Sequence, residues 1–161
     1  MSLCSEQQIR SLFDASWQAA FVITGGGISA LNELLSHSGA SGFVLEAQVP
    51  YHPAALKTYL GSTPESFCSE GTARQLAREA FERAENYYEP SAQPLGISCT
   101  AALQTLRKRR GSDRAFFGFV SAKTEQIFSI QLPEASRFEQ EQRVGKTLLE
   151  HLFCFVEENE L

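Results

Sequence analysis

A run of three glycines separates an apolar segment from an amphipathic one, and this is where the sequence first suggests chemistry. The stretch FVITGGGISALNELL covers residues 21–35. Free N–H groups and the dipole at a helix start favour an anion, and glycine lets a phosphate approach the backbone closely. The candidates to hold a phosphate are the three glycines and the hydroxyl-bearing residues beside them: Thr24, Gly25, Gly26, Gly27 and Ser29.

The glycine run matches neither of the common phosphate-binding motifs. A dinucleotide fingerprint needs a third glycine at position 30, where the chain has Ala30, and no GK[ST] follows for a Walker loop. A tight packing turn between a strand and a helix explains the glycines equally well. The sequence therefore leaves the ligand cradle and the packing turn as open alternatives.

A second set of candidates lies in GISCTAAL at 96–103, which reads as the end of another buried strand. Ligands bind beyond the carboxyl ends of strands in open α/β sheets, so Ser98, Cys99 and Thr100 are expected at a binding site. Cys99 could act as a nucleophile if His52 lowered its pKa. The alternative is that Cys99 is a small core residue and His52 an exposed loop residue.

Two charged segments allow a functional and a structural interpretation. KRR at 108–110 could clamp a phosphate, but a solvated loop is the favoured interpretation. The segment at 72–85 is rich in alanine, arginine and glutamate, which predicts a helix with one packed alanine side and one solvated side.

Composition limits the class of protein. The chain has 161 residues, 43% of them hydrophobic, and a formal net charge of −5. It is expected to form a single domain over residues 1–161, and its charge argues against nucleic acid or an anionic membrane as partner. No segment reaches the ~18 apolar residues of a membrane span, so a cytoplasmic location is expected. The cysteine spacing predicts neither a metal nor a cofactor, and it favours free buried thiols.

The elements that must position these residues alternate between strands and helices. Helical spacing is expected over 6–18 with Ser5 as N-cap, and Ser69 is the expected N-cap of the charged helix. The order predicts a three-layer α/β/α sandwich with a mixed sheet. The expected strands are 19–24, 41–50, 95–103 and a hairpin of 114–122 with 124–132 that turns near Lys123; the remaining helices are 28–35, 52–61 and 138–161.

In this order, the segments resemble the CinA C-terminal domain family, whose active members are nicotinamide mononucleotide deamidases. The resemblance covers residues 6–158 and implies a compact α/β/α domain that self-associates. No single motif carries it. The ordered series does: VITGGG at 22–27, SGAS at 38–41, VPYHPAALKTYLG at 49–61, FCSEGTARQLA at 67–77, GISCTAAL at 96–103 and FGFV at 117–120.

The chain departs from the family at the expected nucleophile. With the family motif E-S-C-T-G-G aligned on its last two glycines, the nucleophilic serine falls on Ile23 and the glutamate on Val22. Isoleucine cannot attack an amide. Thr24 or Ser29 would have to supply the hydroxyl instead.

The family's other site residues are only partly retained. Tyr51 is present, but the lysine that follows V-x-Y falls on Leu56, with Lys57 beside it. One residue along a helix is a rotation of about 100°, so Lys57 need not face the same way. The arginine of the family's last helix corresponds to Arg137 or Arg143, and the register does not choose between them.

Two classes of function follow from the resemblance. The first is an amidohydrolase that releases ammonia from nicotinamide mononucleotide or a related amide, with the amides of Gly26 and Gly27 holding a phosphate or an oxyanion. Its catalytic groups would be Thr24, Ser29, Tyr51 and Lys57. The second is a non-catalytic nucleotide-binding or regulatory module. Both take a phosphorylated small molecule as partner, and both are expected to be homo-oligomers. A structural interaction domain is a third class.

Overall fold

One mixed sheet organises the molecule. The computed structural model describes residues 2–107 and 111–160, so the KRR segment lies outside the described residues. Within those ranges the strands are β1 (Trp17–Thr24), β2 (Val44–Gln48), β3 (Gln93–Ala102), β4 (Arg114–Val120) and β5 (Glu125–Gln131). Their order in the sheet is β2-β1-β3-β4-β5. β1 is parallel to both neighbours, whereas β4 is antiparallel to β3 and β5.

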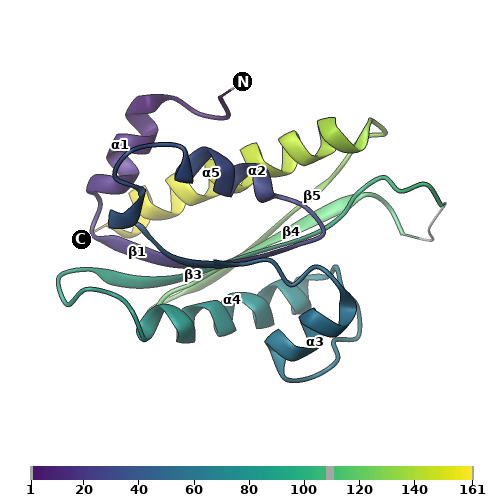
Figure 1. Ribbon diagram of the computed structural model, residues 1–161, viewed down its shortest axis with the longest axis horizontal. Coiled ribbons are helices and arrows are strands. Elements are labelled where there is room, and N and C mark those ends of the chain that lie inside the picture. The colour runs from purple at the N-terminus through teal and green to yellow at the C-terminus, as the bar shows by residue number, and fades with distance from the viewer. Residues whose placement is uncertain (1, 108–110, 161) are drawn as a thin grey trace.

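Helices cover both faces of the sheet (Figure 1). One face carries α1 (Glu6–Asp14), α2 (Ile28–Leu35) and α5 (Arg137–Asn159), and the other carries α3 (Pro53–Leu60) and α4 (Glu70–Glu85). A short 3-10 helix, η1 (Ala40–Gly42), leads into β2. This arrangement confirms the predicted three-layer α/β/α sandwich with a mixed sheet.

Each face of the sheet has its own core, because successive strand residues point to opposite faces. Ile97 and Cys99 of β3 belong to the core shared with Leu148 of α5. Val22 of β1 belongs to the core on the other face, with Leu76 of α4. The predicted alanine side of α4 is buried: Ala73, Ala77, Ala80 and Ala84.

Helix caps and the hairpin turn lie where the sequence predicts them. Ser5 and Gln8 exchange hydrogen bonds in a capping box, with Ser5 N donating to Gln8 Oε1 at 2.9 Å. Ser69 Oγ accepts from the Thr72 amide at 3.1 Å. β4 and β5 are joined by the turn that contains Lys123. These local signals therefore fix one end each of α1, α4, β4 and β5.

Two boundaries differ by more than two residues from those expected. α1 ends at Asp14 rather than near residue 18, because Ala15 is extended (ψ 156°) and Trp17 begins β1. The Trp17 indole packs edge-on against Phe155, with ring centroids 5.5 Å apart. An apolar residue that fits the helical spacing thus belongs to a strand. The strand expected over 41–50 is shorter because η1 occupies its beginning.

The four cysteines are free thiols, as the sequence predicts. Their expected burial is only partly found. Cys68 and Cys99 are buried, Cys4 is half-buried and Cys154 is exposed on α5. Burial raises the pKa of the Cys4 thiol to about 11, and the Glu33 carboxylate adds to this effect.

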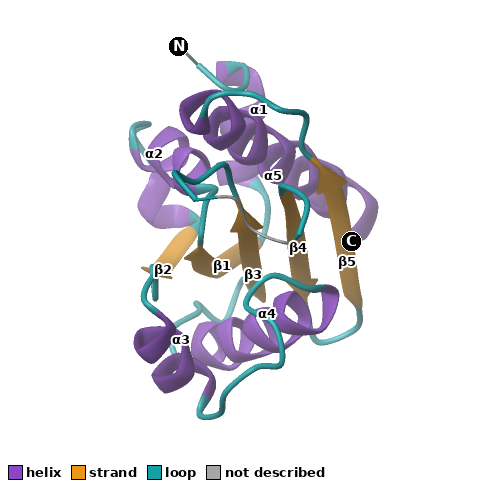
Figure 2. Cartoon of the chain, turned by 90° about the vertical axis from the view of Figure 1, so that its right-hand side faces the viewer, coloured by secondary structure: helices purple, strands orange, loops and turns teal. Residues whose placement is uncertain are grey.

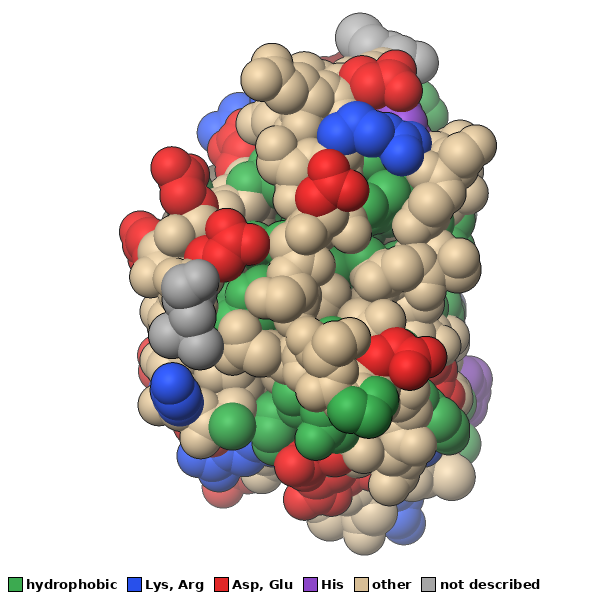
Figure 3. Space-filling view, turned by 90° about the vertical axis from the view of Figure 1, so that its left-hand side faces the viewer, with side chains coloured by type: hydrophobic (Ala, Val, Ile, Leu, Met, Phe, Trp, Pro, Cys, Tyr) green, Lys and Arg blue, Asp and Glu red, His purple; other side chains and the backbone are tan. Residues whose placement is uncertain are grey.

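At the end of the molecule on the left of Figure 1, acidic and basic side chains are mixed among neutral ones (Figure 3). Hydrophobic side chains are visible between them on this face.

No helix in the part of the chain that the structure describes is long and apolar enough to span a membrane.

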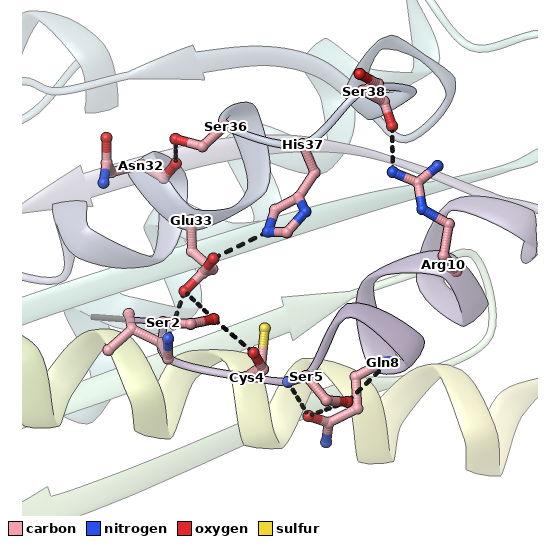
Figure 4. A network of polar contacts seen from close by, with 11 residues as sticks. Ser2, Cys4, Ser5, Gln8, Arg10, Asn32, Glu33, Ser36, His37 and Ser38 are labelled. Atoms are coloured by element: carbon pink, nitrogen blue, oxygen red, sulfur yellow. Dashed lines mark hydrogen bonds and ion pairs between the residues drawn. The ribbon is translucent and has the colours of Figure 1, made fainter.

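A buried carboxylate ties the N-terminal segment to α2 (Figure 4). Glu33 Oε1 accepts from the Leu3 amide and, at 3.2 Å, from Ser2 Oγ, while Oε2 lies 3.0 Å from His37 Nε2. Burial alone raises the pKa of the Glu33 carboxyl. The hydrogen bonds from Leu3, His37 and Ser2 outweigh this effect, so the pKa lies below its ordinary value. Glu33 is therefore held as a charged anchor.

Candidate functional site

Some of the predicted site residues meet where β1 and β3 end. The two strands are parallel neighbours, and Thr24 lies opposite Thr100 in the register. The glycine loop (Gly25–Gly27) then leads from β1 into α2, in the right-hand half of Figure 1 and on the side facing the viewer in Figure 2. The topology therefore places the candidates from both strands at the ligand-binding end of an open α/β sheet.

Packing against β3 requires the glycines of the loop. Gly25 has a φ of +79°, and an added Cβ would lie 1.9 Å from the Ala101 carbonyl oxygen. Gly27 has a φ of +105°, and its Cβ would lie 2.8 Å from Cys99 Sγ. Side chains rarely adopt such angles, and no other residue fits this close to the neighbouring strand. The packing turn that the sequence left open is thus present.

The amides at the start of α2 are paired inside the chain. Glu141 Oε1 accepts from the amides of Gly27 at 2.8 Å and Ile28 at 3.2 Å. Glu141 Oε2 accepts from the Ser29 amide at 3.3 Å and from Ser29 Oγ at 2.7 Å. The helix start expected to be free for a ligand therefore holds a carboxylate from α5.

A hollow of about 460 Å³ lies beside this contact. We refer to it as the hollow; its lining includes Ile23, Gly25, Gly26, Tyr51, Arg137 and Glu141. Arg137 donates from one terminal nitrogen to Tyr51 Oη at 3.0 Å and to the Gly25 carbonyl at 3.3 Å. Its other terminal nitrogen donates to the Gln104 carbonyl at 2.9 Å. The guanidinium of Arg137 thus places a positive charge at the glycine loop.

A smaller cavity of about 270 Å³ adjoins the hollow. The two share Gly25, Tyr51, Leu103 and Arg137, and the smaller one is also lined by Thr24 and Thr100. Thr24 and Thr100 are both nearly inaccessible to solvent, and Thr100 Oγ1 donates to the backbone. The structure thus brings Thr24, Tyr51 and Thr100 together at the smaller cavity, and Tyr51 also lines the hollow.

Ser98 and Cys99 do not line either space. Ser98 Oγ is buried against α4 and donates to the Ala73 carbonyl at 2.6 Å. Cys99 Sγ donates to the Gly26 carbonyl at 3.3 Å on the opposite face, and burial raises the pKa of this thiol well above its ordinary value. His52 caps α3, where its Nδ1 accepts from the Ala54 amide. The Cys99–His52 pair is therefore not formed, and Cys99 is a core residue.

The positions to which the sequence resemblance assigns the family's nucleophile and lysine carry the alkyl side chains of Ile23 and Leu56. Ile23 lines the hollow with an alkyl side chain. Leu56 is buried and lines the smaller cavity, whereas Lys57 is exposed and lines neither space. Ser29 does not line the hollow, and its Oγ donates to Glu141 Oε2.

The sequence did not identify the two charged residues on α5 as a pair. Arg137 and Glu141 are four residues apart and hence share a helix face. Arg143, the alternative to Arg137, lies at a separate small cavity with Leu132 and Gln140. Of the two arginines, Arg137 is therefore the one that lines the hollow. The helical spacing of Arg137 and Glu141 is the signal that could have indicated both.

A metal is not suggested by the side chains. Among residues 2–107 and 111–160, no group of three or more His, Cys, Asp or Glu residues is arranged to hold a metal ion. The charged groups that the described residues bring to the hollow are one guanidinium and one carboxylate.

The fold and the site define an α/β/α domain with a hollow at the carboxyl ends of its parallel strands. No family model and no curated protein matches the sequence. Solved structures of the CinA superfamily do match the fold. A CinA superfamily protein from Enterobacter cloacae is 15% identical over 93% of this chain and 89% of its own, with a TM-score of 0.76.

Two further structures give the same result. A CinA superfamily protein from Klebsiella pneumoniae is 12% identical, with 94% of each chain covered and a TM-score of 0.79. The competence/damage inducible protein CihA from Agrobacterium tumefaciens is 18% identical over 96% of this chain and 98% of its own, with a TM-score of 0.76. The chain therefore has the fold of the CinA superfamily, as the sequence resemblance predicts.

Proposed function

We propose that the chain binds a phosphorylated small molecule in the hollow and does not process it, as a non-catalytic nucleotide-binding or regulatory module. The observation that carries this proposal is the position of Arg137, whose guanidinium bridges Gly25 and Tyr51 at the wall of the hollow. An arginine at the carboxyl ends of parallel strands suits a phosphate, because its planar fork matches the phosphate oxygens.

Arg137 keeps both charge and donors for a ligand. It forms no ion pair within the described residues, and its three hydrogen bonds go to uncharged oxygens. A guanidinium has five N–H donors, so two are left for a ligand. Tyr51 is exposed beside it, and its ring offers a surface on which a planar base can stack.

The side chains argue against turnover. The resemblance assigns the family's nucleophile to Ile23, and none of the described lysines lines the hollow or the smaller cavity. Catalysis requires a nucleophile within hydrogen-bond reach of a base and open to the substrate. Thr24 lines the smaller cavity, and the other residues of the described chain that line it include no histidine, lysine or carboxylate. These features favour binding without chemistry.

Calorimetric titration with nicotinamide mononucleotide tests the binding. Saturable binding to the wild type is expected, together with a rise in melting temperature. Arg137→Gln is expected to weaken binding by about tenfold or more, since hydrogen bonds to a charged group contribute about 1.5–3 kcal/mol. Arg143→Gln is the matched control, because Arg143 lies on the same helix at another cavity. Equal affinities of the two variants would reject the site.

One contact favours the alternative, an amidohydrolase acting on the same class of ligand. Ser29 Oγ donates to the Glu141 carboxylate at 2.7 Å, which is the geometry of a hydroxyl nucleophile and a general base. An assay for ammonia release from nicotinamide mononucleotide separates the two functions. We expect no release above the blank. Release that is abolished in Ser29→Ala or Thr24→Val would establish the enzyme instead.

A further inference from the structure

The anion-binding end of α2 already has an occupant. Both carboxylate oxygens of Glu141 are directed at the first turn of α2, where they accept from three consecutive amides and one hydroxyl. These are the donors that a helix start offers to a phosphate. Glu141 also lines the hollow, so its carboxylate lies between the helix start and the space open to a ligand.

We propose that Glu141 is a specificity-determining residue that keeps phosphate away from the start of α2 and directs it to Arg137. A phosphate at the helix start would need the same amides and would meet a like charge. Since the carboxylate already uses these donors and the positive end of the dipole, the helix start offers an incoming anion little attraction. Among the described residues that line the hollow, Arg137 carries the positive charge.

Helix packing holds Glu141 in this position. Gly145 lies one helical turn further along α5 and allows α5 to approach the first turn of α2 closely. A Cβ at Gly145 would lie 1.8 Å from Ser29 Oγ and 3.0 Å from the Ala30 amide nitrogen. Val144 and Leu148 anchor the same part of α5 in the core. The carboxylate is thus part of a packed helix–helix contact rather than of a mobile loop.

The exclusion of phosphate from α2 is independent of the proposed function, and only the redirection to Arg137 rests on it. The proposed function and the exclusion of phosphate from α2 involve different parts of the glycine loop. The loop contributes the Gly25 and Gly26 backbone to the wall of the hollow. Its last residue, Gly27, donates its amide to Glu141 and so cannot donate it to a ligand at the same time.

Titration of the ¹⁵N-labelled full chain with inorganic phosphate tests the inference. In the wild type, the amide resonances of Gly27, Ile28 and Ser29 are expected to stay unchanged. In Glu141→Ala and Glu141→Gln they are expected to shift with saturation, at an affinity at least about tenfold higher than in the wild type. Glu141→Gln keeps the side-chain volume and guards against misfolding of the alanine variant. Glu150→Ala, exposed on the same helix, should behave as the wild type.

Two results would overturn the inference. One is a saturable shift of the three α2 amides in wild-type protein. The other is the absence of such a shift in Glu141→Gln or Glu141→Ala when the spectrum shows a folded chain. If nicotinamide mononucleotide fails to bind the wild type while phosphate binds α2 in the variants, the proposed function and the redirection to Arg137 fall, and the exclusion of phosphate from α2 stands. If the nucleotide binds through Arg137 and phosphate also shifts the wild-type α2 amides, only this inference falls.

Discussion

The glycines of the candidate site are explained by packing, whereas the hydrogen-bond partners of the amides show whether a ligand can bind there. Gly25 and Gly27 have positive φ angles and face β3 so closely that packing alone accounts for them. A glycine run is therefore weak ground for a phosphate site even where a strand leads into a helix. The partners of the amides decide the matter, and here three of them belong to Glu141.

Gly145 provides a test of the contact between α2 and α5 at the scale of one residue. Gly145→Ala adds a Cβ that would lie 1.8 Å from Ser29 Oγ. Overpacking costs about 1–3 kcal/mol, which exceeds the gain of up to about 1 kcal/mol that alanine brings to a helix. We therefore expect a lower free energy of unfolding in urea. Lys146→Ala, exposed on the same helix, is the control. A variant more stable than the wild type would contradict the close contact.

At the scale of elements, a second contact can be tested. Glu33 attaches the N-terminal segment to α2. The folded-state pKa of this carboxyl lies below its unfolded value of about 4.3, so the attachment stabilises the protein fully above that pH. The stabilisation is lost as the pH falls through the folded-state pKa. Glu33→Gln should thus lower the melting temperature near neutral pH.

The difference between wild type and Glu33→Gln should shrink as the pH falls from about 6 to about 3, because protonated Glu33 resembles glutamine. Melting followed by circular dichroism across this range measures it. Glu82→Gln, exposed on α4, controls for the general loss of a negative charge. A constant difference at all pH values would show that the charge of Glu33 does not hold the segment.

The sequence predicts the helices and strands better than it predicts the contacts between them. Apolar periodicity and the caps at Ser5 and Ser69 are local signals, so the sequence predicts the layers and most of the element ends. Trp17 was misplaced because its apolar spacing fits a helix and a strand equally well. Ser29 and Glu141 are 112 residues apart, and no local pattern links them. Only the packing of α5 on α2 brings them together.

At the scale of the whole molecule, several exposed apolar side chains gather around the hollow. Ile28, Val49 and Phe138 are 43%, 48% and 72% exposed, and all three line the hollow. They come from three separate parts of the chain, so the fold gathers them at one site. Exposed apolar groups that gather at one place mark a binding or association surface. The expectation of a homo-oligomer therefore has a candidate surface, which we call the apolar rim.

We expect the wild type to self-associate through the apolar rim and to sediment, at micromolar concentration, as a species larger than 17.8 kDa. Phe138→Ser removes the most exposed side chain of the rim and should shift the distribution toward the monomer, because the buried apolar area falls. Leu35→Ser is the matched control, since Leu35 is 56% exposed on α2 but does not line the hollow. A single wild-type species of 17.8 kDa would reject self-association. Assembly that both variants retain equally would place the contact elsewhere and leave the rim free for the ligand.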